Sequence, residues 1–200
     1  MDKYFYAPTG EHELQYSPVN AIIGPRPIGW ISSVSPSGQA NLAPYSFFNV
    51  FNRKPPIIGF ASIGRKDSVR NIEATGQFCW NMVSTSQLAA MDATSDPITG
   101  DEFEFAGIEK APSRLIAVPQ VAQSHAVFEC LLTQIEQLKD ASGKVTESVM
   151  VFGEVIGVHL DRSMIDDGLF ITERAEPLLR SGGAETYFRI TAESRIDYRR

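Results

Sequence analysis

Two long runs of residues, 124–139 and 145–161, alternate polar and apolar side chains and are joined by the turn sequence Asp140-Ala-Ser-Gly-Lys144. Alternation with a period of two is typical of strands that bury one face. A short turn that contains Asp, Ser and Gly makes two such runs antiparallel neighbours. We therefore predict a long β-hairpin, which restricts the rest of the chain to folds built around an antiparallel sheet.

The remainder of the chain supplies more short strands. Pro44 interrupts one of them and indicates an edge strand, a bulge or a break at that point. Because strands and helices do not alternate regularly, a doubly wound sheet is disfavoured and a closed or partly closed antiparallel barrel is favoured. The additional strand-like runs are 27–35, 40–52, 55–63 and 78–84.

The predicted helices are short and peripheral. One begins near Asp67 or Ser68, either of which can cap it, and Gly76 can end it. Another is expected near 86–93, and a helix or turn over 163–176. The chain is expected to form one domain, 1–200, with an N-terminal arm (1–17), an excursion from the core (94–119) and a partly strand-like tail (184–200).

Composition narrows the class of protein. Hydrophobic residues make up 43% of the chain and charged residues 21%, which is ordinary for a soluble globular domain. The net charge of −6 argues against a nucleic-acid partner. No apolar stretch approaches a membrane span, and the N-terminus has no secretory signal. Together with only two cysteines, this leads us to expect a cytoplasmic protein without a membrane partner.

The charge is unevenly distributed along the chain. Residues 1–80 hold seven Lys/Arg and five Asp/Glu, whereas residues 81–200 are strongly acidic. The basic excess is concentrated between Arg53 and Arg70, and the acidic excess peaks in 92–109. A local basic site in an acidic protein suits a small anionic ligand, although a merely lopsided surface has the same signature.

The segment from Ser62 to Ser68 contains the strongest local signal for an anion. A strand ends, Gly64 lets the chain turn, Arg65 and Lys66 follow, and a helix begins. Free N–H groups at a helix start, with two cations and the Ser68 hydroxyl, can hold a phosphate group. The alternative is a capped surface helix with two solvated cations.

Residues 41–49 combine aromatic, amide and hydroxyl side chains around Pro44. Since proline frees backbone groups from strand pairing, this segment can contact the edge of a flat polar heterocycle. The alternative is an aromatic strand of the core.

The sequence shows no motif for a metal site, a nucleophile or a nucleotide-binding loop. His12, His125, His159, Cys79 and Cys130 are scattered without metal-ligand spacing, so we predict no metal site. We predict that the two cysteines are buried strand residues and not nucleophiles. Neither a phosphate-binding loop of the G-x-x-x-x-G-K-S/T type nor a G-x-G-x-x-G motif is present. The sequence therefore identifies no catalytic residue.

With these segments in order, the chain from about Pro25 to Tyr187 resembles the flavin reductase-like family of FMN-binding split barrels, which includes flavoredoxin and nitrilotriacetate monooxygenase component B. The resemblance rests on several short motifs in a characteristic order. They are Arg26-Pro-Ile-Gly-Trp-Ile-Ser-Ser33, Asn41-Leu-Ala-Pro-Tyr-Ser-Phe-Phe48, Lys54-Pro-Pro56, Arg65-Lys-Asp-Ser-Val-Arg-Asn-Ile72, Glu129-Cys130, Phe152-Gly-Glu-Val-Ile-Gly-Val-His159, and Arg180-Ser-Gly-Gly183 with Tyr187.

The resemblance implies a six-stranded antiparallel split β-barrel, a homodimer and non-covalently bound FMN. It places Ser32 and Ser33 near the ribityl–phosphate end of FMN. The isoalloxazine ring is expected to lie along Asn41, Leu42, Ala43, Pro44, Tyr45 and Ser46, largely against their backbone. The phosphate is expected to bind Ser62, Arg65, Lys66 and Ser68. Arg180 and Tyr187 receive no role.

The implied reaction is hydride transfer from NAD(P)H to FMN, followed by reoxidation by a downstream acceptor or monooxygenase. The flavin performs this chemistry, so no side-chain acid or base is required. Three alternatives remain: another FMN-dependent oxidoreductase, a non-enzymatic electron carrier like flavoredoxin, and a binding protein without flavin.

Overall fold

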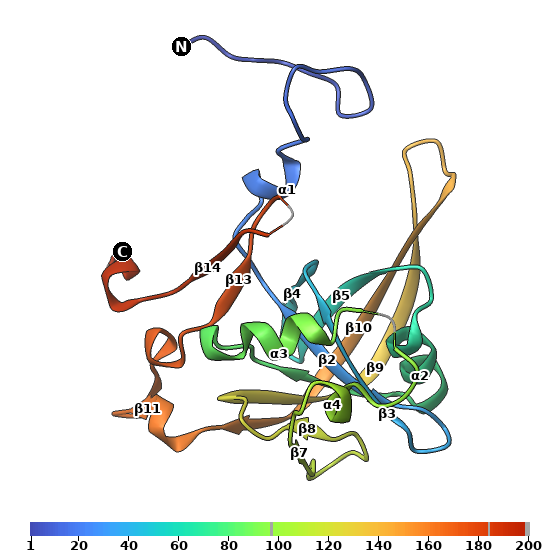
Figure 1. Ribbon diagram of the computed structural model, residues 1–200, viewed down its shortest axis with the longest axis vertical. Coiled ribbons are helices and arrows are strands. Elements are labelled where there is room, and N and C mark those ends of the chain that lie inside the picture. The colour runs from blue at the N-terminus through green and yellow to red at the C-terminus, as the bar shows by residue number, and fades with distance from the viewer. Residues whose placement is uncertain (97, 184, 199–200) are drawn as a thin grey trace.

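The computed structural model describes residues 1–96, 98–183 and 185–198. Residues 184, 199 and 200 of the expected tail therefore lie outside the described part of the chain. Figure 1 shows a strand-rich body, from which the N-terminal arm and the tip of one long hairpin project. No helix among the described residues is long and apolar enough to cross a membrane.

The principal sheet is antiparallel throughout, with the spatial order β3-β2-β6-β9-β10-β5-β4. The predicted hairpin is confirmed as its two longest strands, β9 and β10, which pair with each other. The strands of this sheet are β2 (Gly29–Val34), β3 (Ala40–Tyr45), β4 (Phe48–Arg53), β5 (Pro56–Ile63), β6 (Gln77–Asn81), β9 (Ala126–Lys139) and β10 (Val145–Leu160).

The sheet curls until its two ends meet. Tyr45 on the edge strand β3 packs against Phe60 on β5, near the other end of the strand order, with ring centroids 4.4 Å apart. Both belong to one buried cluster that also contains Ile31, Phe78 and Val151. A single apolar interior shared by distant strands is the packing of a closed antiparallel barrel. The predicted mainly β split-barrel architecture is confirmed.

The sheet has one strand more than the six expected, because the run 40–52 divides at residues 46–47 into β3 and β4. Pro44 lies on β3 opposite Trp30 of β2. Since β3 is an edge strand, the missing N–H of Pro44 breaks no ladder on its outer side. The edge-strand interpretation of this proline is confirmed.

Short helices cover the outside of the barrel. Alternation along β2 and β3 sends Ile31 inward, whereas Trp30 and Leu42 join an outer apolar cluster with Met91 and Phe103. This outer layer fixes the excursion 94–119 against the barrel. The helices are α1 (Val19–Ile22), α2 (Asp67–Thr75), α3 (Leu88–Ala93) and α4 (Glu102–Phe105), with 3₁₀ turns η1 (Thr85–Gln87), η2 (Arg162–Met164), η3 (Thr172–Ala175) and η4 (Ala192–Ser194).

Helix α2 confirms most of its prediction. Val69 and Ile72 are buried on one face, and Gly76 ends the helix with a φ of 71°, a conformation that glycine adopts without strain. The predicted cap is wrong. The helix already begins at Asp67, so the capping position falls on Lys66, whose side chain cannot accept a hydrogen bond.

Smaller sheets complete the molecule. The tail returns to the barrel as a strand, and β1, β13 and β14 form a three-stranded sheet beside it (Figure 1). The minor strands are β1 (Arg26–Pro27), β7 (Lys110–Ala111), β8 (Gln120–Val121), β11 (Ile165–Asp166), β12 (Leu169–Phe170), β13 (Leu178–Arg180) and β14 (Tyr187–Arg189).

Candidate functional site

A cavity of about 410 Å³ lies between the edge strand β3, the N-terminus of α2 and residues 94–96 and 98–102. Its volume falls in the range of small-molecule sites. Segments far apart in the sequence meet here because β3 has no strand on its outer side. The described residues that line it are Asn41, Ala43, Pro44, Tyr45, Gly64, Arg65, Lys66, Asp67, Ser68, Arg70, Thr94, Ser95, Asp96, Ile98 and Glu102. We call it the β3–α2 cavity.

The N-terminus of α2 opens into this cavity without a side-chain cap. Its first N–H groups therefore lack the side-chain acceptor that capping residues provide. Arg65 forms an ion pair with Glu73, and Arg70 pairs with Asp67. Lys66 forms no ion pair within the described part of the chain. The N-terminus of α2 and three cationic side chains thus line the same cavity, an arrangement that suits an anion.

The floor of the cavity consists of buried polar side chains. Asn41 Nδ2 donates to Ser68 Oγ at 2.8 Å. Tyr45 is 6% exposed, and its hydroxyl is the one buried side-chain polar atom in the described residues that has no hydrogen-bond partner. Burial raises the pKa of Tyr45 above its ordinary value, although the nearby hydroxyls of Ser68 and Ser62 act in the opposite direction. An unpartnered buried hydroxyl is unfavourable unless a ligand completes its hydrogen bonding.

The opposite wall is formed by residues 94–96 and 98–102, and two hydrogen bonds attach it to the sheet. Trp30 Nε1 donates to Thr94 Oγ1 at 3.0 Å. The backbone N–H of Leu42 donates to Glu102 Oε2 at 3.3 Å. Burial raises the pKa of Glu102, and the charges of Asp67 and Asp101 act in the same direction. The wall is therefore anchored to β2 and β3, on which the cavity is built.

The structure brings most of the predicted ligand residues together. Asn41, Ala43, Pro44 and Tyr45 line the cavity from β3, while Arg65, Lys66 and Ser68 line it from the start of α2. The segment 41–49 divides between core and cavity, because Leu42 and Phe48 are core residues whereas Asn41 and Pro44 line the cavity.

Five predicted residues do not line the cavity. Ser32 points to the other side of β2, where its hydroxyl donates to the Pro119 carbonyl and accepts from Asn81. Strand alternation sends Ser33 to the opposite face of β2, where it is fully buried and accepts a hydrogen bond from Asn71 of α2.

The other three differ for local reasons. The side chain of Leu42 packs in the outer cluster, so only its backbone lies near the cavity wall. Ser62 Oγ donates to the Gly64 carbonyl at 2.8 Å and braces the turn before α2. Ser46 lies beyond Pro44 and lines a second, adjoining cavity.

Sequence reasoning missed the wall residues Thr94, Ser95, Asp96, Ile98 and Glu102. The only available signal was that the acidic excursion leaves the core, and nothing in its pattern says where it returns. Arg70, Gly64 and Asp67 were also missed as lining residues, although they belong to the segment that was identified.

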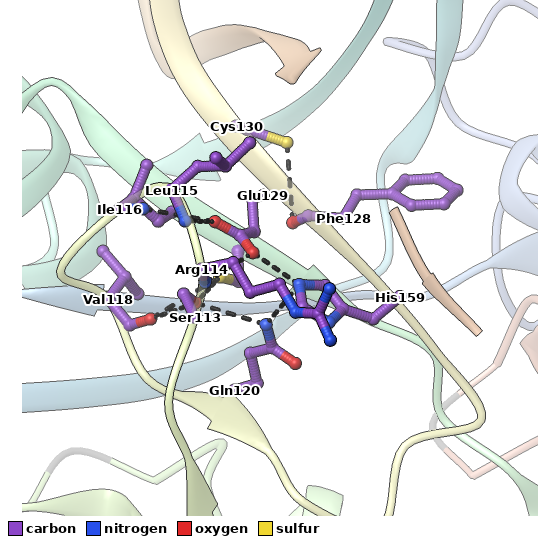
Figure 2. Close-up of polar contacts among 11 residues, drawn as sticks. Ser113, Arg114, Leu115, Ile116, Val118, Gln120, Phe128, Glu129, Cys130 and His159 are labelled. Carbon is purple, nitrogen blue, oxygen red and sulfur yellow. Dashed lines mark hydrogen bonds and ion pairs between the residues drawn. The ribbon is translucent and has the colours of Figure 1, made fainter. Parts of the chain in front are cut away.

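A second cluster of polar groups lies away from this cavity and surrounds Glu129 (Figure 2). The fully buried carboxylate accepts from the backbone N–H groups of Arg114, Leu115 and Ile116 at 2.9, 2.7 and 3.2 Å, and it also binds His159 Nε2. These contacts lower the pKa of Glu129 despite its burial. We interpret the Glu129 cluster as a clamp that holds the loop 113–118 against β9.

The cysteines are inert strand residues. Cys79 and Cys130 are fully buried, and burial raises the pKa of Cys79 to about 12 and that of Cys130 well above its usual range. A thiol that stays protonated is a poor nucleophile. Within the described residues, no group of three or more His, Cys, Asp or Glu side chains is placed to hold a metal ion.

Residues 24–179 match the family model described as Flavin reductase like domain. The chain belongs to this family. An uncharacterized protein from Aquifex aeolicus is 33% identical over 176 residues, which cover 84% of this chain and 86% of that protein. The resemblance stated from the motifs is thereby confirmed.

Solved structures agree over nearly the whole chain. Nitrilotriacetate monooxygenase component B from Bacillus cereus superimposes with a TM-score of 0.86 at 26% identity, covering 98% of this chain and 100% of that one. The 2-nitrobenzoate 2-nitroreductase of Pseudomonas fluorescens gives a TM-score of 0.85 at 30% identity, with coverages of 98% and 96%. Both are similar to this flavin reductase-like protein in sequence as well as in fold.

Proposed function

We propose that the β3–α2 cavity binds FMN non-covalently and that the protein is an NAD(P)H-dependent flavin oxidoreductase. The observation that carries the proposal is the meeting of an uncapped helix N-terminus with an unpartnered, buried Tyr45 hydroxyl in one cavity. Both features are unfavourable in an empty protein and favourable beside a phosphate monoester.

The chain's residues fit the two ends of FMN. Lys66, the first N–H groups of α2 and the hydroxyls of Ser68 and Tyr45 would hold the phosphate, with Arg65 and Arg70 adding positive charge. On β3, the outward N–H of Leu42 is taken by Glu102 and Pro44 has none. The edge of β3 near Pro44 therefore offers mainly carbonyl oxygens, which suit the ring N–H of an isoalloxazine.

When bound, FMN would supply hydride and electron chemistry. The chain's role is to hold the ring against β3 and leave one face accessible to a nicotinamide. This division of labour agrees with a cavity whose carboxyl groups among the described residues, Asp67, Asp96 and Glu102, are not hydrogen-bonded to one another.

Anaerobic mixing with NADH and then NADPH tests the activity. The purified protein is expected to carry a visible flavin band that bleaches rapidly with one of the two nucleotides, compared with free FMN at the same concentration. A yellow protein that neither nucleotide bleaches would identify an electron carrier instead. A protein that does not bind added FMN would overturn the proposal entirely.

We further propose that the protein is a homodimer that passes electrons to a separate acceptor such as a monooxygenase. The edge strand β4 supports a self-association surface, because Val50 and Phe51 are 60% and 55% exposed on it. Light scattering coupled to size exclusion is expected to give twice the chain mass of 22.1 kDa. A monomeric mass at micromolar concentration would refute the dimer.

A further inference from the structure

A second cavity, of about 300 Å³, adjoins the β3–α2 cavity and shares Pro44 and Ser95 with it. Its walls come from β1–β2, α3 and the tail, and none of its other residues lines the first cavity. We call it the Arg180 cavity. Its lining residues are Ile28, Pro44, Ser46, Met91, Asp92, Ser95, Arg180 and Tyr187.

The hairpin of β13 and β14 positions the cation of this cavity. Arg180 and Tyr187 are paired across the hairpin, and the guanidinium lies 4.7 Å from the centre of the Tyr187 ring. Arg180 also donates to the carbonyls of Thr186 and Gly183, at 2.9 and 3.0 Å. A guanidinium held by a ring and two carbonyls is already ordered, so binding an anion would require little further loss of side-chain freedom.

A second arginine reinforces the positive charge. Arg26 on β1 lies directly opposite Arg180 on β13. It donates to the carbonyl oxygens of Ser46, Asn20 and Ser181, and within the described residues it forms no ion pair with a carboxylate. Burial lowers the pKa of Arg26, and the nearby charge of Arg180 acts in the same direction. Arg180 therefore lines the cavity with a second guanidinium next to it on β1, and Asp92 is the one carboxylate among the described lining residues.

The remaining surface is apolar and small. Ile28 and Met91 are buried side chains of the outer cluster, and Pro44 separates this cavity from the first. A volume of about 300 Å³ is at the lower end of the range for small-molecule sites. It suits one aromatic ring with a short substituent rather than a whole dinucleotide.

We propose that the Arg180 cavity binds a small aromatic carboxylate, with its carboxylate facing Arg180 and its ring against Ile28, Pro44 and Met91. The ligand would lie beside the flavin across Pro44, and this part of the proposal rests on the function proposed above. The binding itself depends only on the chain's own residues.

Benzoate and its neutral isostere benzamide are suitable probes. Their binding to the full-length protein, with and without added FMN, can be measured by ligand-detected NMR and by calorimetry. We expect benzoate to bind at least roughly tenfold more tightly than benzamide, since a charge-assisted hydrogen bond contributes that much. Equal affinities for the two probes would overturn the proposal.

Two variants move the expected affinity in opposite directions. Arg180→Gln should weaken benzoate roughly tenfold and leave benzamide unchanged. Asp92→Asn should strengthen benzoate by roughly fivefold, because it removes a like charge. Asp92 is exposed on α3, and its carboxylate makes no hydrogen bond to any residue that the structure describes, so this variant tests the proposal even if Arg180→Gln disturbs the fold around β13.

Arg174→Gln is the matched control, because Arg174 is an exposed arginine that pairs with Asp166 outside both cavities. If neither Arg180→Gln nor Asp92→Asn changes the affinity for benzoate, the proposed site is refuted. FMN binding, followed in parallel by flavin fluorescence, separates the two proposals. FMN binding without benzoate selectivity would refute only the Arg180 cavity, whereas selective benzoate binding without FMN binding would refute only the flavin site.

Discussion

The β3–α2 cavity and the Glu129 cluster both contain buried polar groups, yet they differ in how those groups are satisfied. Around Glu129, a carboxylate receives three backbone N–H groups and a histidine. In the cavity, a tyrosine hydroxyl has no partner and a helix begins without a cap. Completed hydrogen bonding marks a group that stabilises the fold, whereas missing hydrogen bonding marks a place for a ligand.

The largest expected effect is on the Glu129 cluster. Glu129→Leu removes the acceptor of three backbone N–H groups, and we expect the free energy of unfolding to fall by about 3–5 kcal/mol. Urea denaturation measures this loss. The control is Glu136→Gln, which changes an exposed glutamate on the same strand and should have little effect. A loss below about 1 kcal/mol would mean that the cluster is not structural.

The second prediction concerns the β3–α2 cavity and its affinity for FMN. The double variant Arg65→Ala/Lys66→Ala should weaken FMN binding by about 2–4 kcal/mol, because charge-assisted bonds to the phosphate are lost. Riboflavin, which has no phosphate, should be nearly unaffected. Titrations that follow flavin fluorescence give both affinities. Equal losses for FMN and riboflavin would contradict the phosphate assignment at α2.

Tyr45→Phe is the smaller and more diagnostic change. Removing an unpartnered hydroxyl should leave the stability of the flavin-free protein unchanged or slightly higher, while FMN affinity falls by about 1 kcal/mol. Thermal unfolding without FMN and fluorescence titration with FMN give the two numbers. A clear loss of stability in the flavin-free protein would show that the hydroxyl serves the fold and not a ligand.

The smallest effect is the dependence of stability on pH. The folded-state pKa of Glu129 lies below its ordinary value of 4.5, so its contribution is fully present above that value and declines as the pH falls below it. The folded-state pKa of Glu102 is raised, so its ionisation opposes folding as the pH rises. Urea denaturation between pH 3 and pH 7 should therefore show a steeper acid loss in the parent protein than in Glu129→Gln. Identical profiles would contradict the assignment.

Local sequence was sufficient for the parts of the site that lie within one segment. The strand, Gly64, the two cations and the following helix are consecutive, so the anion site at Arg65, Lys66 and Ser68 could be predicted. The exact helix start could not, because Asp67 and Ser68 were equally plausible caps. Ser32 and Ser33 were assigned to the site together, although strand alternation sends their side chains to opposite faces of β2. Ser33 is hydrogen-bonded to Asn71 of α2, whereas Ser32 is hydrogen-bonded to Pro119 on the other face.

The sequence by itself determined the class of fold, because the period of two along 124–139 and 145–161 and the turn between them act over short distances. It also determined the family, through motifs that keep their order. Only the tertiary structure decided that residues 94–96 and 98–102 return to β3 and complete the cavity, that residues 114–116 enclose Glu129, and that β13 places Arg180 beside Arg26. These contacts join residues far apart in the chain, and they depend on the closure of the barrel, which no local pattern records.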